Sequence, residues 1–186
     1  MSERPSVSVI IATYNRSEVL RYAIQSVLAQ RFSDFELLVI GDCCTDDSER
    51  VAKSFGDARV RWDNLPENAG SQWAPNNRGL ELARGRYIAY LGHDDLWHPD
   101  HLSILASAIG RESADLVFAV TEELGPAADA TGWLFGLAPP GWNVWAINAP
   151  PSSWLHRQDL PHRIGAWRDS RTIVLPIDLE FLGRAF

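Results

Sequence analysis

The first half of the chain alternates between short apolar runs and longer amphipathic segments. Residues 7–13 read VSVIIAT, a run of β-branched and small side chains with almost no polar alternation. Such a run is typical of a strand that is buried on both faces of a parallel sheet. Residues 17–30 then carry apolar side chains at helical spacing, and Ser17 stands where a helix N-cap is expected. The pattern therefore predicts a strand followed by its crossover helix.

The same unit recurs as far as residue 120. Further strands are predicted at 35–40, 59–62, 87–91 and 115–120, and further helices from about 48, near 72–84 and at 101–109. Strands that alternate with helices indicate a mostly parallel sheet with right-handed crossovers. We therefore expect an α/β fold in which helices flank one sheet.

A long segment rich in Gly, Pro, Ala and Trp interrupts this pattern. It covers residues 122–151 and predicts an extended loop of the kind that often carries function. Trp62 and Trp97 lie close to predicted helices and strands, so we expect them to serve packing. The tryptophans inside the loop are better candidates for an aromatic platform on which the sugar ring of an acceptor molecule could stack. These are Trp133, Trp142 and Trp145.

Length, charge and cysteine content narrow the function classes. With 186 residues the chain is expected to form a single domain over 1–186. Its net charge of -7, from 17 basic and 24 acidic residues, argues against nucleic acid as a partner. No apolar stretch reaches the roughly 18 residues of a membrane span, and no signal peptide is evident, so we expect a cytoplasmic protein. The adjacent Cys43 and Cys44 exclude a disulfide framework and match no zinc spacing.

Three polar clusters follow predicted strands at their carboxyl ends. TYNR follows the first strand, GDCCTDDS the second, and GHDD the strand at 87–91. Ligands bind at this edge of parallel sheets, so Asp42, Asp94 and Asp95 are expected to gather there. Their mutual repulsion would be relieved by a cation or by hydrogen-bond donors, and oxygen-rich sites suit magnesium or manganese bound to phosphates. Asp42 taken alone could instead hold a turn or cap a helix.

These motifs, in this order and spacing, resemble an inverting family 2 glycosyltransferase of the GT-A fold. The resemblance rests on VSVIIATYNR, FELLVIGDCCTDDS and NAGSQWAPNNRGLELARGRYIAYLGHDDLWHPDHL. It covers residues 7–105 with few gaps and is thin beyond residue 120. It implies a Rossmann-like sheet with a nucleotide-sugar-binding half at 1–120. The acceptor-side half at 121–186 is expected to end short of longer relatives.

The resemblance implies a role for each matching residue. Asp42 would hydrogen-bond the nucleotide base, and Asn77 would lie near the nucleotide. Asp94 falls on the last position of the family's DXD motif and would hold Mn²⁺ or Mg²⁺ at the donor's diphosphate, with Asp95 beside it. His93, at the middle position, is expected in an exposed loop next to the donor. The implied donor-binding residues are Thr13, Tyr14, Asn15, Arg16, Asp42, Asn77, His93 and Asp94.

Asp178 lines up with the family's catalytic base and follows Pro176 at the start of a predicted helix. The implied activity is metal-dependent transfer of a sugar from a nucleoside diphosphate donor, with a UDP-sugar as the first candidate. The implied acceptor is a saccharide or a lipid-linked molecule, as in polysaccharide biosynthesis, and peripheral contact with a membrane stays open. The oligomeric state stays open as well.

The sequence departs from the family pattern at several motif positions, which are Gly41, Cys43, Cys44, Asn76, Gly92 and Ile177. These departures keep a second function open, a module that binds a sugar nucleotide without turnover. A nucleotidyltransferase is disfavoured because TYNRSE has one arginine and no glycine. The absence of GxxxxGK[ST] and GxGxxG also argues against a P-loop enzyme and a nicotinamide-binding domain.

Overall fold

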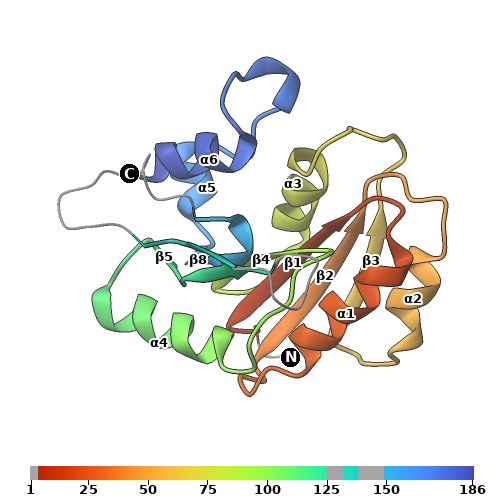
Figure 1. Ribbon diagram of the computed structural model, residues 1–186, viewed down its shortest axis with the longest axis horizontal. Helices are drawn as coiled ribbons and strands as arrows, with labels where there is room; N and C mark the ends of the chain where they lie inside the picture. Colours follow the sequence, from red (N-terminus) through yellow and green to blue (C-terminus); the bar gives the residue numbers. More distant parts are fainter. Residues whose placement is uncertain (1–3, 125–131, 138–148) are drawn as a thin grey trace.

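A six-stranded sheet forms the centre of the molecule (Figure 1). The computed structural model describes residues 4–124, 132–137 and 149–186. Within them the strand order is β3-β2-β1-β4-β8-β5. The strands are β1 Val7–Thr13, β2 Phe35–Gly41, β3 Val60–Asn64, β4 Tyr87–Gly92, β5 Leu116–Phe118 and β8 Trp154–Arg157. The predicted α/β fold with a mostly parallel sheet is confirmed.

The four strands from β3 to β4 are parallel, so their carboxyl ends meet at one edge. In β1, Ile10 lies opposite Leu38 of β2 and Tyr90 of β4. β8 then pairs antiparallel with both β4 and β5. Sequence patterning did not predict β8, since it has only four residues and includes the buried polar side chain of His156.

Helices cover both faces of the sheet. They are α1 Ser17–Leu28, α2 Ser48–Ser54, α3 Trp73–Leu82, α4 His101–Glu112, α5 Leu160–Ile164 and α6 Ile177–Ala185. α1, α2 and α4 lie on one face, and α3, α5 and α6 lie on the other (Figure 1). In the three described ranges, no helix has the length and apolar character needed to cross a membrane.

The alternation of side chains along β1 builds a core on each face of the sheet. Val7, Val9 and Ile11 are buried with the apolar side chains of α1, α2 and α4. Ile10 points the other way and is buried with residues of α6 such as Phe181. Burying an aliphatic side chain contributes about 1.5 to 3 kcal/mol, so strands that are apolar on both sides stabilise this layered arrangement most.

The expected N-cap at Ser17 is wrong. The α-helix already includes Ser17, and Arg16 occupies the N-cap position. The backbone N–H of Ser17 donates to Oδ2 of Asp46 at 2.9 Å, so a carboxylate from the loop after β2 caps this helix from outside. Burial acts to raise the pKa of Asp46, but hydrogen bonds from Ser48 and Ser17 outweigh it and keep that pKa below its usual value.

The segment predicted as an extended loop contains a small hairpin. β6 Thr121–Glu123 pairs antiparallel with β7 Trp133–Phe135. Two three-residue strands carry too little period-two alternation to stand out from a Gly- and Pro-rich background. The loop prediction for 122–151 is therefore wrong at these strands and at the short 3₁₀-helix η2 Pro151–Ser153.

Candidate functional site

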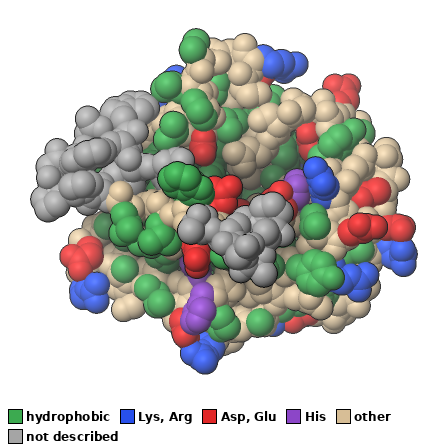
Figure 2. All heavy atoms as spheres, in the orientation of Figure 1, with side chains coloured by type: hydrophobic (Ala, Val, Ile, Leu, Met, Phe, Trp, Pro, Cys, Tyr) green, Lys and Arg blue, Asp and Glu red, His purple; other side chains and the backbone are tan. Residues whose placement is uncertain are grey.

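A pocket of about 310 Å³ opens at the carboxyl ends of β1, β2 and β4. It brings together residues from all three polar clusters that follow these strands. Its lining consists of Ala12, Thr13, Tyr14, Asp42, Asn68, Gly70, Ser71, Gln72, Pro75 and His93. In the space-filling view, acidic side chains and a histidine surround a recess between the part that carries α6 and the part that carries α3 (Figure 2).

Thr13 lines this pocket and carries a buried hydroxyl. The residue is only 2% exposed, and its Oγ1 has no hydrogen-bond partner within the described residues. A buried hydroxyl without a partner costs about 1 to 3 kcal/mol, so this position favours a ligand that hydrogen-bonds it. The neighbouring Tyr14 lines the pocket with a half-exposed ring.

Asp42 ties the end of β2 to the segment that precedes α3. Its Oδ1 accepts from the backbone N–H of Ala69 at 2.8 Å. Its Oδ2 accepts from Nδ2 of Asn68 at 3.0 Å and from the N–H of Gly70 at 3.1 Å. A carboxylate offers about four acceptor sites, so these three bonds leave room for one from a ligand. Asp42 therefore holds a turn and lines the pocket at the same time.

Asn15 and Arg16 support the site from outside the pocket lining. Asn15 adopts a left-handed backbone conformation with φ of 47°. Its Oδ1 accepts from the N–H groups of Thr45 at 2.9 Å and Asp46 at 3.3 Å. The side chain thus joins the loops after β1 and β2, while Arg16 begins α1 as its N-cap.

The side chains around Gly41 explain why glycine replaces the residue of the family pattern at this position. A Cβ at this position would lie 2.3 Å from Oδ1 of Asn64 and 2.9 Å from the Trp62 ring, so a larger residue does not fit. Asn64 instead holds the loop through both backbone groups of Cys44. The Cys44 thiol donates to the carbonyl of Thr13 at 3.3 Å, and burial raises the pKa of that thiol. Cys44 thus serves as a small packing side chain.

The turn after β4 carries the predicted metal ligands. His93 lines the pocket, and its Nε2 lies 3.8 Å from Oδ2 of the exposed Asp94. Asp94 and Asp95 follow just outside the lining. Carboxylate oxygens fit Mg²⁺ or Mn²⁺, but the described ranges contain no group of three metal-ligating side chains. A cation held here would need further ligands from a bound diphosphate and water.

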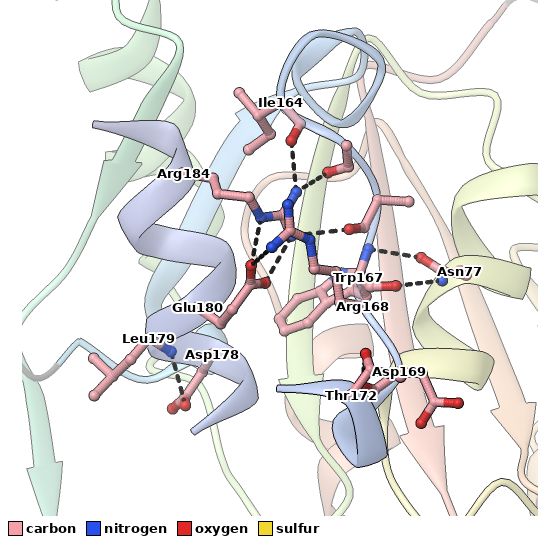
Figure 3. A network of polar contacts seen from close by, with 12 residues as sticks. Asn77, Ile164, Trp167, Arg168, Asp169, Thr172, Asp178, Leu179, Glu180 and Arg184 are labelled. Atoms are coloured by element: carbon pink, nitrogen blue, oxygen red, sulfur yellow. Dashed lines mark hydrogen bonds and ion pairs between the residues drawn. The ribbon is translucent and has the colours of Figure 1, made fainter. Parts of the chain in front are cut away.

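Asn77 bonds a loop rather than the pocket. Its Nδ2 donates to the carbonyl of Trp167 at 2.8 Å, and its Oδ1 accepts from the N–H of Trp167 at 3.0 Å (Figure 3). The Trp167 ring then donates from Nε1 to the hydroxyl of Tyr90 at 3.0 Å. This chain of bonds fixes α3 against the segment that leads to α6.

A second network fixes α6, where Asp178 lies in the first turn (Figure 3). The buried carboxylate of Glu180 pairs with Arg184 and Arg168, each at 2.9 Å. Arg184 also donates to the carbonyls of residues 164, 165 and 166. Asp178 itself is half-buried, and its Oδ1 accepts from the N–H of Leu179 at 2.9 Å. The predicted helix at the tail is confirmed, and its position is well held.

Sequence reasoning missed one wall of the pocket. This wall comes from the segment between β3 and α3 and from the first turn of α3, and it consists of Asn68, Gly70, Ser71, Gln72 and Pro75. Gly70 has φ of 73°, which favours glycine and allows the sharp turn around Asp42. The signal was available, because NAGSQ also follows the carboxyl end of a strand.

The predictions for tryptophans are partly tested. Trp97 is buried and stacks on His101 with ring centroids 4.5 Å apart, and the partly buried Trp62 packs against the core on the face of the sheet that α1, α2 and α4 cover. Their predicted packing roles are therefore confirmed. Trp133 is exposed on β7, while Trp142 and Trp145 lie outside the described residues.

Known proteins resemble this chain both in sequence and in fold. The poly(ribitol-phosphate) β-N-acetylglucosaminyltransferase TarP of Staphylococcus aureus is 36% identical over 115 residues, which are 60% of this chain and 35% of TarP. TarS of Staphylococcus aureus in complex with UDP superposes with a TM-score of 0.81 at 19% identity, over 97% of this chain and 54% of that one. A mannosyltransferase from Pyrobaculum calidifontis with GDP-Man and Mn²⁺ gives 0.72 at 16%, over 97% and 51%.

The chain spans only about a third of the length of the curated relatives it matches. A profile of the family described as Glycosyl transferase family 2 matches residues 8–133. This range includes every strand and loop that contributes to the pocket. The chain therefore belongs to glycosyl transferase family 2.

Proposed function

We propose that this chain transfers a sugar from a UDP-sugar to an acceptor hydroxyl with inversion at the anomeric carbon. The observation that carries the proposal is the buried hydroxyl of Thr13, which has no hydrogen-bond partner among the described residues and lies with Asp42 in a pocket at the strand ends. Support comes from TarS, which has been solved with UDP and with UDP-GlcNAc. TarP, by its name, transfers N-acetylglucosamine to poly(ribitol-phosphate), so a saccharide-type polymer is the proposed acceptor class.

The nucleotide would occupy the pocket between Thr13 and Asp42. The Thr13 hydroxyl offers one donor and acceptor, and the carboxylate of Asp42 accepts an N–H of the base. The half-exposed Tyr14 adds an aromatic surface at the mouth. This mode of binding does not require a glycine-rich phosphate-binding loop after β1, because the bound phosphates would lie toward the turn after β4.

Asp94 would hold a divalent cation at the donor's diphosphate. The side chain is 68% exposed and follows the pocket residue His93 directly, so it can reach a phosphate that leaves the pocket. When bound, the cation would supply positive charge that stabilises the departing diphosphate. The Mn²⁺ present in the Pyrobaculum calidifontis mannosyltransferase complex supports this assignment.

Asp178 is the proposed base that takes the proton of the acceptor hydroxyl. The helix dipole favours a carboxylate in the first turn of α6 by about 0.3 to 1 kcal/mol, so a structural role alone would also explain it. One variant separates the two. Asp178→Asn keeps the shape, and we expect sugar transfer to fall by about 100-fold or more while UDP affinity and melting temperature hardly move. A variant that melts early but transfers normally would leave Asp178 with a structural role.

The donor class is tested by a thermal-shift screen with UDP, GDP and dTDP, each with and without manganese. A ligand that binds only the folded state raises the melting temperature. We expect UDP with manganese to give the largest rise. Release of UDP from a UDP-sugar then separates an enzyme from a module that binds without turnover. A UDP-stabilised protein that releases no UDP under any acceptor condition would support the binding module.

A further inference from the structure

The turn after β4 holds two carboxylates over a residue without a side chain. A Cβ placed on Gly92 would lie 2.6 Å from Oδ2 of Asp95 and 3.3 Å from Oδ1 of Asp94. Real Cβ atoms do not approach an oxygen as closely as 2.6 Å. The Asp95 side chain can therefore take this position only because residue 92 is glycine.

Ser152 holds Asp95 in that position. Its Oγ donates to Oδ2 of Asp95 at 2.5 Å, a distance typical of a hydroxyl bonded to a carboxylate. The same Oγ accepts from the N–H of Gly92 at 2.9 Å. One buried hydroxyl thus bridges both ends of the turn, although it comes from a segment 57 residues further along the chain.

Contacts outside the turn also hold Ser152 in place. It lies in η2, directly before β8, and its carbonyl accepts from Nε1 of the buried Trp97 at 2.6 Å. Trp97 comes from the segment between the turn and α4. The serine therefore presents its hydroxyl from a rigid frame, as a residue that positions a functional side chain should.

We propose that Asp95, held by Ser152, replaces the carboxylate that the family's DXD motif places at position 92. This inference rests on the proposed function. Asp94 and Asp95 then form the acidic pair that faces the cation and diphosphate, and Ser152 is a positioning residue. Two carboxylates that converge on one point repel each other unless a cation or hydrogen-bond donors compensate. Ser152 donates to one oxygen of Asp95, and the nearest histidine nitrogen to Asp94 is 3.8 Å away, so the turn is arranged to receive positive charge.

The test is UDP binding by calorimetry with and without manganese. We expect Asp95→Asn, which keeps the shape and the bond from Ser152, to lower UDP affinity about 10- to 100-fold in manganese and hardly at all without it. Gly92→Asp alone should also weaken binding, because the new side chain displaces Asp95. Gly92→Asp combined with Asp95→Ala should bind UDP in manganese more tightly than either single variant, since the carboxylate has moved to the family's position.

Ser152→Ala should shift the manganese dependence in the same direction as Asp95→Asn, and Ser152→Thr should restore it. Glu112→Gln removes an exposed charge at the far end of α4 and serves as the control. An Asp95→Asn protein with wild-type affinity for UDP in manganese would overturn this inference alone. A wild-type chain that binds no nucleoside diphosphate would overturn the proposed function, and this inference with it. If the Gly92→Asp, Asp95→Ala protein does not fold, the UDP affinities of Asp95→Asn, Ser152→Ala and Ser152→Thr still test the inference.

Discussion

Asp42 shows how one side chain serves both stability and binding. The residue is 4% exposed and its carboxylate accepts three hydrogen bonds from residues 68–70, so it forms one wall of the pocket and shapes the opposite wall. A purely structural role, in which Asp42 only holds a turn, therefore accounts for its hydrogen bonds but not for its place in the pocket lining. The remaining acceptor capacity of the carboxylate is what the proposed function uses.

Asp42→Ala should therefore lower two quantities together. The free energy of unfolding should fall by about 1 to 3 kcal/mol, because three partly buried hydrogen bonds to a charged group are lost. UDP affinity should fall by about 1.5 to 3 kcal/mol, the range for a hydrogen bond to a charged group. Urea unfolding and calorimetry measure the two. Asp47→Ala, at an exposed aspartate near the end of the same loop, is the control and should change both quantities far less. Normal UDP affinity in a folded Asp42→Ala protein would remove Asp42 from the binding site.

At the scale of elements, α3 sets the pocket wall through a close approach to β1. A Cβ on Gly79 would lie 2.6 Å from Cγ2 of Ile10, so the helix can lie this near the sheet only with glycine there. The first residues of the same helix reach the pocket through Pro75. Packing on one side of α3 thus decides the geometry on the other.

Gly79→Ala should lower the free energy of unfolding by about 1 to 3 kcal/mol through overpacking. Gly110→Ala is the matched variant, because a Cβ at Gly110 in α4 meets no atom of the described residues within 4 Å. It should raise the free energy of unfolding by about 0.5 to 1 kcal/mol, since glycine is unfavourable inside a helix. Chemical denaturation measures both, and equal effects of the two substitutions would argue against the close packing of α3.

The elements differ in how well the sequence predicts them. The strands β1, β2 and β4 are long apolar runs between clear turns, so their positions and the polar clusters at their ends were predicted. β8 was missed because its identity depends on pairing with β4 and β5, which no local pattern records. The cap of α1 was misassigned because Asp46, its true partner, lies far along the chain. The role of Ser152 was not predicted either, because its partner Asp95 lies 57 residues away in the sequence.

At the scale of the whole molecule, a buried polar network joins the sheet to the segment that leads to α6. Nδ1 of His156 lies 2.7 Å from the carbonyl of Arg157 and must donate to it, so Nε2 accepts from the hydroxyl of Tyr90 at 3.1 Å. Trp167 donates to that same hydroxyl. His156 is fully buried, and burial lowers its pKa to about 4. Protonation would remove the acceptor that Tyr90 needs.

This network makes stability depend on pH. The pKa of His156 is about 4 in the folded chain and near 6.5 when unfolded, so the unfolded state binds more protons between these values. The free energy of unfolding should thus fall as the pH drops below 6.5, by about 2 kcal/mol between pH 7 and pH 5 from this residue. His101, whose pKa burial also lowers to about 4, adds in the same direction. Urea unfolding at both pH values measures the change.

His156→Gln is the control for this prediction, because glutamine can both accept from Tyr90 and donate to the carbonyl of Arg157 without titrating. Its free energy of unfolding should change less between pH 7 and pH 5 than that of the wild-type chain. An identical pH dependence in the two proteins would show that His156 titrates normally.

The central claim is that the pocket at the ends of β1, β2 and β4 holds the nucleotide of a sugar donor. Calorimetric titration of the wild-type chain with UDP in manganese, beside Thr13→Val, tests it most directly. Valine keeps the volume of threonine but removes the buried hydroxyl, which has no partner in the described part of the protein. We predict saturable binding at one site in the wild-type chain and an affinity about 10-fold lower in the variant, as expected for one lost hydrogen bond. No saturable binding of UDP, or equal affinity in both proteins, would contradict the account.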